Sequence, residues 1–214
     1  MPETVAILLA AGESRRMGRP KALLDWEGTT LLDYQISALR VAGVGRVVVV
    51  LGHQPENLTP IISGRQGVDW TVNPNYAQGK TTSIKAGLNA LCSGGNEISV
   101  ILILNVDHPR TSGTVREVLR RHRETGKLVT IPTFKGKGGH PIALDPILMP
   151  ELLLIVEETF GVKAVVQAHA DSTNRTEMPD SEILWDLNTP EEYQAALQSQ
   201  RHLGLPIVSN KNFP

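Results

Sequence analysis

The sequence predicts an α/β fold: a three-layer α/β/α sandwich on a mostly parallel, Rossmann-like sheet. Aliphatic runs without polar interruption, such as 46–51 and 100–104, are typical of strands buried on both faces. Amphipathic helical patterns alternate with these runs along most of the chain, and this alternation is typical of parallel strands joined by helical crossovers. With 214 residues, the chain is long enough to bury the core of one such domain.

Seven strands are expected, each an apolar or β-branched run bounded by turn residues. They lie at 5–9, 46–51, 68–72, 100–104, 128–132, 140–144 and 183–187. The run at 68–72 is the weakest, because polar residues interrupt it. The strands at 128–132 and 140–144 flank a glycine-rich loop at 134–139.

The helices are expected where apolar side chains recur at three- and four-residue spacing. They lie at 30–41, 81–91, 112–125, 146–157 and 161–169, with a last one opening at 189–194. Leu32, Ile36 and Leu39 form one stripe, and Gly43 follows where a helix would end. Pro190 suits the first position of the last helix. Residues 1–203 therefore form one expected domain, and 204–214 an expected loose tail.

Composition excludes several classes of protein. A formal net charge of −1 argues against a dedicated nucleic-acid binder, which would be basic overall. The sequence has no secretory signal pattern and no apolar run long enough to cross a bilayer. Cys92 is the only cysteine, so no intrachain disulfide can form. We therefore expect a cytoplasmic protein.

The segment 8–21 after the first strand is the strongest motif. Its turn formers are Gly12, Ser14 and Gly18. Its cations are Arg15, Arg16, Arg19 and Lys21. Backbone N–H groups beside such cations can hold the phosphates of a nucleoside triphosphate. The spacing matches neither a P-loop nor a dinucleotide fingerprint, and the alternative is an ordinary basic surface loop.

Polar side chains follow two other expected strands, at the sheet edge where ligands bind in such folds. Asp107 comes shortly after the run 100–104, where a carboxylate can hold Mg²⁺; the alternative is a turn cap. Asp186 lies near the end of the last expected strand, and Asn188 comes directly after that strand. Asn188 ranks slightly ahead of Asp186 as a second metal ligand, although Asn188 could equally cap the next helix.

The segment 75–87 places a glycine before an expected helix. Gly79 precedes a first turn that carries Thr82 and Ser83. The free N–H groups of this turn can hold a base or a phosphate, and plain helix capping is the alternative.

The pattern Ala10-Ala-Gly-x-Ser-x-Arg-Met-Gly-x-Pro-Lys21 resembles the molybdenum cofactor nucleotidylyltransferases (MobA-like NTP transferases), and within them most the molybdopterin cytidylyltransferase type. The resemblance implies a sheet of the nucleotide-diphospho-sugar transferase (GT-A-like) type. It implies catalytic roles for Arg15, Lys21 and Asp107. The nucleotide-binding residues that it implies are Leu9, Ala10, Ala11, Gly12, Ser14, Arg15, Lys21, Gly79, Thr82 and Ser83.

The resemblance extends to the later segments. Asn188 matches a metal or phosphate ligand of the relatives, with Asp186 as a second candidate, and Gly139 and His140 match a loop near the acceptor. The chain departs from the relatives around Gly161, where their aspartate and arginine are missing. This departure concerns the acceptor half of the site.

The resulting prediction is a transferase that moves CMP from CTP to a phosphate-bearing acceptor with Mg²⁺ or Mn²⁺ and releases pyrophosphate. The resemblance implies molybdopterin or the molybdenum cofactor as acceptor and a molybdoenzyme as a possible recipient of the product. Alternatives are a sugar phosphate, polyol phosphate or methylerythritol phosphate acceptor, GTP-dependent guanylyl transfer, or a non-catalytic cofactor-binding chaperone. No nucleic-acid or membrane partner is expected.

Overall fold

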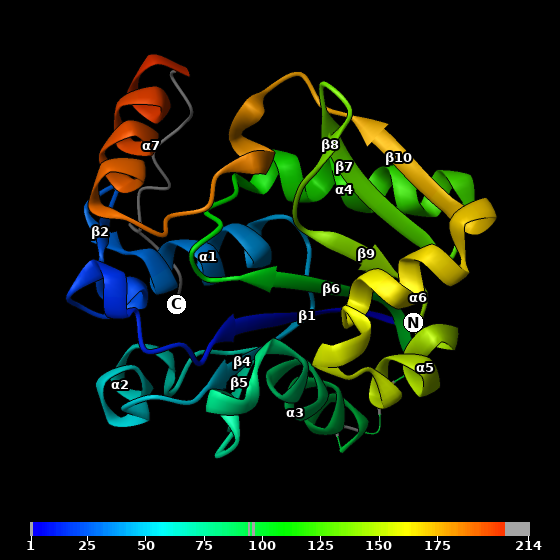
Figure 1. The fold of residues 1–214 in the computed structure, drawn as a ribbon, viewed down its shortest axis with the longest axis horizontal. Helices are drawn as coiled ribbons and strands as arrows, with labels where there is room; N and C mark the ends of the chain where they lie inside the picture. Colours follow the sequence, from blue (N-terminus) through cyan, green and yellow to red (C-terminus); the bar gives the residue numbers. More distant parts are fainter. Residues whose placement is uncertain (1, 94, 96, 204–214) are drawn as a thin grey trace.

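The computed structural model describes residues 2–93, 95 and 97–203, which form a three-layer α/β/α sandwich around one main sheet (Figure 1). The predicted fold class is confirmed. The main-sheet strands are β1 (Glu3–Ala10), β4 (Arg46–Leu51), β5 (Val68–Val72), β6 (Ile98–Asn105), β7 (Val129–Phe134), β8 (Lys137–Gly138), β9 (Ile142–Leu144) and β10 (Thr173–Glu177). A separate small hairpin pairs β2 (Asp25–Trp26) with β3 (Thr29–Thr30). The predicted tail at 204–214 lies outside the described residues.

The sheet is mostly parallel. Its order is β10-β7-β9-β6-β1-β4-β5, with β8 paired to β7. Strands β6, β1, β4 and β5 run parallel to one another, whereas β9 runs antiparallel between β6 and β7. The carboxyl ends of β1, β4 and β6 therefore meet at one edge, beside the loop that follows β1 (Figure 1).

Helices cover both faces of the sheet, and β1 shows why its sequence is apolar throughout. Ala6 and Leu8 face a core shared with helices α1 (Leu31–Val41) and α4 (Ser112–Thr125). Ile7 and Leu9 face a second core, shared with α3 (Lys80–Cys92), α5 (Met149–Leu154) and α6 (Val162–Ala168). The short α2 (Thr59–Ile62) and the last helix α7 (Pro190–Leu203) complete the fold.

An aromatic cluster attaches α7 to the region that follows β1. Trp26 is fully buried, and its ring centroid lies 6.1–6.2 Å from those of Tyr34, Trp185 and Tyr193. The Tyr193 hydroxyl also donates a hydrogen bond to the Asp25 carbonyl. These contacts bring the segment before α7 next to the loop after β1.

The predicted strand at 183–187 is wrong. Residues Ser181–Leu184 form a 3-10 turn and the chain then continues without sheet pairing, so Asp186 and Asn188 do not share a strand face. The carbonyls of Ile183 and Trp185 accept hydrogen bonds from the Arg110 guanidinium instead of from a neighbouring strand. At this end of the described sheet lies β10, which pairs with β7 and is largely polar, so it carries no apolar pattern.

Two other segments differ in detail. The predicted helix at 146–157 is divided into a 3-10 turn at Pro146–Leu148, the helix α5 and a second 3-10 turn at Glu157–Thr159. The predicted loop at 134–139 is the tip of a hairpin in which β8 pairs with β7. Neither difference moves the strand ends that carry the candidate site residues.

Candidate functional site

The loop after β1 is held in a compact shape by two residues with left-handed backbone. Ser14 has φ 56° and Gly18 has φ 68°, and they bracket a 3-10 turn at Arg15–Met17. The Ser14 hydroxyl accepts a hydrogen bond of 2.9 Å from the Lys21 N–H. This bond closes the loop, so Lys21 begins its own turn directed toward the strand ends.

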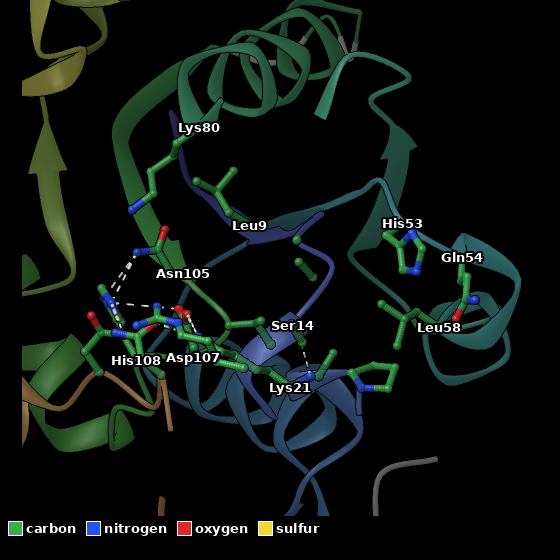
Figure 2. Close-up of a pocket in the computed structure, with 18 of the residues that line it drawn as sticks. Leu9, Ser14, Lys21, His53, Gln54, Leu58, Lys80, Asn105, Asp107 and His108 are labelled. Atoms are coloured by element: carbon green, nitrogen blue, oxygen red, sulfur yellow. Dashed lines mark hydrogen bonds and ion pairs between the residues drawn. The ribbon is translucent and has the colours of Figure 1, made fainter. Parts of the chain in front are cut away.

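Lys21 forms the centre of the site. Its Nζ donates to Asp107 Oδ2 at 2.7 Å (Figure 2). It also donates to Asn188 Oδ1 at 2.8 Å. Arg16 Nη2 also donates to Asn188 Oδ1, at 3.0 Å. The structure therefore joins the loop after β1, the end of β6 and the segment before α7, as the sequence predicted for Lys21, Asp107 and Asn188.

Asp107, His108 and Asp186 form a second group, whose ligand atoms all lie within 4.8 Å of one another. His108 Nε2 lies 3.4 Å from Asp186 Oδ1 and 3.8 Å from Asp107 Oδ1. The hydrogen bond from His108 lowers the pKa of Asp186 to about 2, so this carboxylate stays charged at neutral pH. The Leu187 N–H donates to the Asp107 carbonyl at 2.9 Å and ties the two segments together.

The donor set fits a divalent cation. Two carboxylates and the Asn188 amide offer the oxygen ligands that Mg²⁺ and Mn²⁺ prefer. The Lys21 ammonium already lies between the Asp107 and Asn188 oxygens, which shows that these oxygens are arranged around positive charge. Asp107, Asp186 and Asn188, with His108 beside them, could therefore hold a metal ion.

A cavity of about 360 Å³ opens over these groups (Figure 2). The predicted site residues that line it are Leu9, Ala10, Gly12, Ser14, Lys21, Asp107, Asp186 and Asn188. Ala11 is buried beneath the loop, where its carbonyl accepts the His53 N–H. Arg15 is turned outward, with 83% of its side chain exposed, and pairs with Glu13. The neighbouring Arg16, rather than Arg15, lines the cavity.

The start of α3 lies beside this cavity, and its hydroxyls are engaged within the protein. The Asn73 amide donates to Thr82 Oγ1 at 2.8 Å and to Ser83 Oγ at 2.9 Å. The Thr81 N–H donates to a Glu157 carboxylate oxygen at 2.7 Å. Gly79 leads into the helix with φ 121°. The lining residue from this segment is Lys80, which the sequence analysis did not select.

Gly139 and His140 lie behind the metal-ligand candidates rather than in the cavity lining. The His140 ring packs against the His108 ring with centroids 4.5 Å apart. Burial lowers the pKa of His140 well below its ordinary value, and nearby His108 and Arg110 add to the effect. Gly139 lies against the Ile183 backbone, where a side chain would not fit. The structure thus brings both residues to the site, as support for His108 and the 183–188 segment.

Sequence reasoning missed several residues that line the cavity. They are His53, Gln54, Lys80, Asn105 and His108, among others. His53 and Gln54 follow β4, and His108 follows Asp107. Treating the residues after every predicted strand as candidates would therefore have selected these three.

Among the described residues, no helix has the length and apolarity to cross a membrane.

Comparisons with known proteins identify the family of the chain. Residues 6–173 match the family described as MobA-like NTP transferase domain. The chain is 28% identical over 191 residues to the molybdenum cofactor cytidylyltransferase of Escherichia coli (strain K12), covering 89% of this chain and 93% of that protein. It is 29% identical over 203 residues to the nicotine blue oxidoreductase of Paenarthrobacter nicotinovorans, covering 90% and 95%.

The fold is similar to that of solved structures. Rv0371c from Mycobacterium tuberculosis H37Rv superimposes with a TM-score of 0.78 at 21% identity, covering 92% of this chain and 98% of that one. A complex of that protein with manganese gives a TM-score of 0.74 at 21% identity, covering 92% and 99%. The family match spans most of the chain and includes the loop after β1 and the end of β6. The chain therefore belongs to the MobA-like NTP transferase family and is a nucleotidyltransferase.

Proposed function

We propose that this chain transfers CMP from CTP to a terminal phosphate of an acceptor, with molybdopterin or the molybdenum cofactor as the acceptor. The observation that carries the proposal is the Lys21 ammonium held between Asp107 and Asn188 in a cavity also lined by Arg16. Cations and metal-ligating oxygens in one cavity suit a triphosphate and its counter-ion. The molybdenum cofactor cytidylyltransferase relative supports the acceptor and the base.

In this reaction an oxygen of the acceptor phosphate attacks the α-phosphorus of CTP. The bond from the α-phosphorus to the oxygen bridging to the β-phosphorus breaks, and pyrophosphate leaves with that electron pair. The acceptor phosphate is already ionised, so the protein needs no covalent nucleophile. Its contribution is position and charge neutralisation.

The residues divide this work between them. Lys21 and Arg16 would hold the β- and γ-phosphates and the charge that develops on pyrophosphate, with Arg15 at the rim of the loop. Asp107, Asp186 and Asn188 would hold Mg²⁺ or Mn²⁺. The Rv0371c neighbour has been solved as a complex with manganese, which supports a divalent metal as such and no particular ligand. A bound metal would supply Lewis-acid stabilisation of the phosphate oxygens. The nucleotide would be held by Leu9, Ala10, Ala11, Gly12 and Ser14, with Gly79, Thr82 and Ser83 nearby. Gly139 and His140 lie behind the cavity lining and would serve the acceptor side by positioning His108 and the 183–188 segment.

The choice of base follows from weaker signals. The Ala11-Gly12 and Pro20-Lys21 pairs favour cytosine, as in the cytidylyltransferase type. We further propose that the enzyme acts in the cytoplasm and passes its product to a molybdoenzyme. Relatives at about the same identity carry names as different as a cytidylyltransferase and an oxidoreductase, so the substrates need a direct test.

The test offers CTP, GTP, ATP and UTP with Mg²⁺ or Mn²⁺ and follows the melting temperature, then pyrophosphate release with each acceptor. We expect CTP to give the largest stabilisation, about 2.7 kcal/mol at a hundred times its Kd, and molybdopterin to give pyrophosphate. Release with methylerythritol phosphate or a sugar phosphate, but not with molybdopterin, would reject the acceptor. Preferential stabilisation by GTP would reject the base. Tight cofactor binding without pyrophosphate from any pair would instead indicate a carrier.

A further inference from the structure

Arg110 is a fully buried arginine that lies directly behind the metal-ligand candidates. Only 1% of its surface is exposed. It follows Asp107, His108 and Pro109 in the turn after β6, and it is not among the residues that line the cavity. Burial lowers its pKa to about 10, so the guanidinium is protonated at neutral pH. A buried charge of this kind needs a compensating reason to be present.

The guanidinium hydrogen bonds all go to backbone carbonyls among the described residues. Nη1 donates to Pro109 O at 2.7 Å and Nε donates to His140 O at 2.8 Å. Nη2 donates to Ile183 O at 2.7 Å and to Trp185 O at 3.1 Å. One side chain therefore joins three segments that are far apart in the sequence.

Each of the three segments carries a side chain of the site. The first carries Asp107 and His108, the second carries His140, and the third leads directly to Asp186. The third segment is not part of a strand, so no sheet pairing holds it in place. This segment is held near Asp107 by the Arg110 bonds to Ile183 O and Trp185 O and by the bond from the Leu187 N–H to the Asp107 carbonyl. The buried carboxylate of Glu182, at the start of the segment, adds a third attachment.

That carboxylate explains how the charge of Arg110 is tolerated. Glu182 is buried and accepts a hydrogen bond of 3.1 Å from Thr111 and another from Thr114. Its charge, with those of Asp186 and Asp107, favours the protonated guanidinium. Arginine suits this place because its planar fork offers five donors in fixed directions, whereas a lysine ammonium cannot reach all three segments.

We propose that Arg110 is a positioning residue that sets the separation of the candidate metal ligands Asp107 and Asp186 by bridging the backbones that carry them. The proposal rests on the metal role in the proposed function. Outer groups that orient metal ligands typically change metal affinity by about 10- to 100-fold when they are replaced.

The test measures Mn²⁺ binding by electron paramagnetic resonance, without nucleotide, in the wild type and in Arg110→Lys. The lysine keeps the charge and loses the fork, so we expect Mn²⁺ to bind at least about tenfold more weakly. Arg40→Lys is the matched control. Arg40 Nη1 donates to the carbonyls of Val44 and Gly45 away from the site, so its replacement removes similar bonds and should leave Mn²⁺ affinity unchanged.

The outcomes separate the two proposals. If Mn²⁺ binds neither the wild type nor Lys21→Ala, in which the competing ammonium is removed, the metal role and the positioning role are overturned together. If only Lys21→Ala binds Mn²⁺, the Arg110→Lys comparison is made in that background. A wild type that binds Mn²⁺, with Arg110→Lys binding equally well, overturns the positioning role alone, because charge would then suffice. An equal loss in Arg40→Lys also overturns it, since general destabilisation would explain the effect.

A measurement on the wild type covers the case in which Arg110→Lys does not fold. The His140 N–H donates to Ile183 O, and the Leu187 N–H donates to Asp107 O. If Arg110 couples the segments, added Mn²⁺ should slow hydrogen exchange at both amides together. Slower exchange at Leu187 with no change at His140 would overturn the proposal.

Discussion

The Lys21 ammonium lies 2.7 Å from the Asp107 carboxylate, in an ion pair whose side chains are only 12% and 21% exposed. The same carboxylate belongs to the group that could hold a metal ion. Lys21 and a metal ion would therefore compete for one set of oxygens until a triphosphate draws the ammonium away. This competition has a measurable consequence.

Replacing Lys21 should separate metal binding from catalysis. Without nucleotide, we expect Lys21→Ala to bind Mn²⁺ more tightly than the wild type, because Asp107 loses its cationic partner. We also expect its turnover rate to fall by a factor of about 10²–10³. Titration with Mn²⁺ and a pyrophosphate assay measure the two effects. Lys80→Ala removes a lysine of the same cavity that is outside this ion pair, and its Mn²⁺ affinity should change less. Weaker Mn²⁺ binding in Lys21→Ala would contradict the competition.

Asp107→Asn tests the carboxylate with almost no change in volume. We expect the fold to be retained and turnover to fall by about 10²–10³, because the amide brings no charge to the metal-ligand candidates. Circular dichroism checks the fold, and pyrophosphate release checks turnover. A rate near that of the wild type would show that Asp107 holds no essential metal.

The two neighbouring arginines should differ in their effect on nucleotide binding. Arg16 lines the cavity, whereas Arg15 is largely exposed and paired with Glu13. We expect Arg16→Ala to raise the KM for the nucleotide by about tenfold or more, the scale of one lost charge-assisted bond, and Arg15→Ala to raise it by less. Steady-state kinetics on the two variants measures both KM values. A larger effect at Arg15 would mean that the loop rearranges when the nucleotide binds.

Two glycines in different surroundings should respond oppositely to alanine. A Cβ on Gly139 would clash with the Ile183 carbonyl oxygen, so Gly139→Ala should destabilise the fold by about 1–3 kcal/mol. A Cβ on Gly113, in α4, meets its nearest atom at 3.7 Å, and Gly113→Ala should stabilise by about 0.4–1 kcal/mol. Urea unfolding measures both free energies, and a neutral Gly139→Ala would show that the 183–188 segment can shift freely.

Stability should fall in mild acid because of His122. This imidazole is buried and lies 3.1 Å from the Thr130 hydroxyl, and burial lowers its pKa below the ordinary value. The unfolded chain then binds the proton more readily, so this contribution to stability is complete above about pH 6.5 and is lost as the pH falls below it. We expect His122→Gln to lose less free energy of unfolding than the wild type between pH 7.5 and 5.5. Equal losses would exclude His122 as a cause.

Local sequence was sufficient for most of the fold because buried parallel strands leave a strong pattern. The runs at 46–51 and 100–104 are apolar on both faces, and the structure confirms them as β4 and part of β6. The edge strand β10 leaves no such pattern, because its residues are polar and most of them contact water. The other edge strand, β5, alternates apolar and polar residues and is predicted for that reason. The sequence therefore does not predict β10, and it wrongly predicts a strand at 183–187, where Ile183 and Leu184 belong to a 3-10 turn.

The sequence by itself determined the layers of the fold and the central pair of the candidate site, Lys21 and Asp107, because strand ends of a parallel sheet converge whatever surrounds them. Only the tertiary structure decided how Asp186 and Asn188 reach that pair. Their segment has no regular structure of its own, and its path depends on Arg110, Glu182 and the aromatic cluster around Trp26. Such contacts join residues far apart in the chain, so no local pattern encodes them.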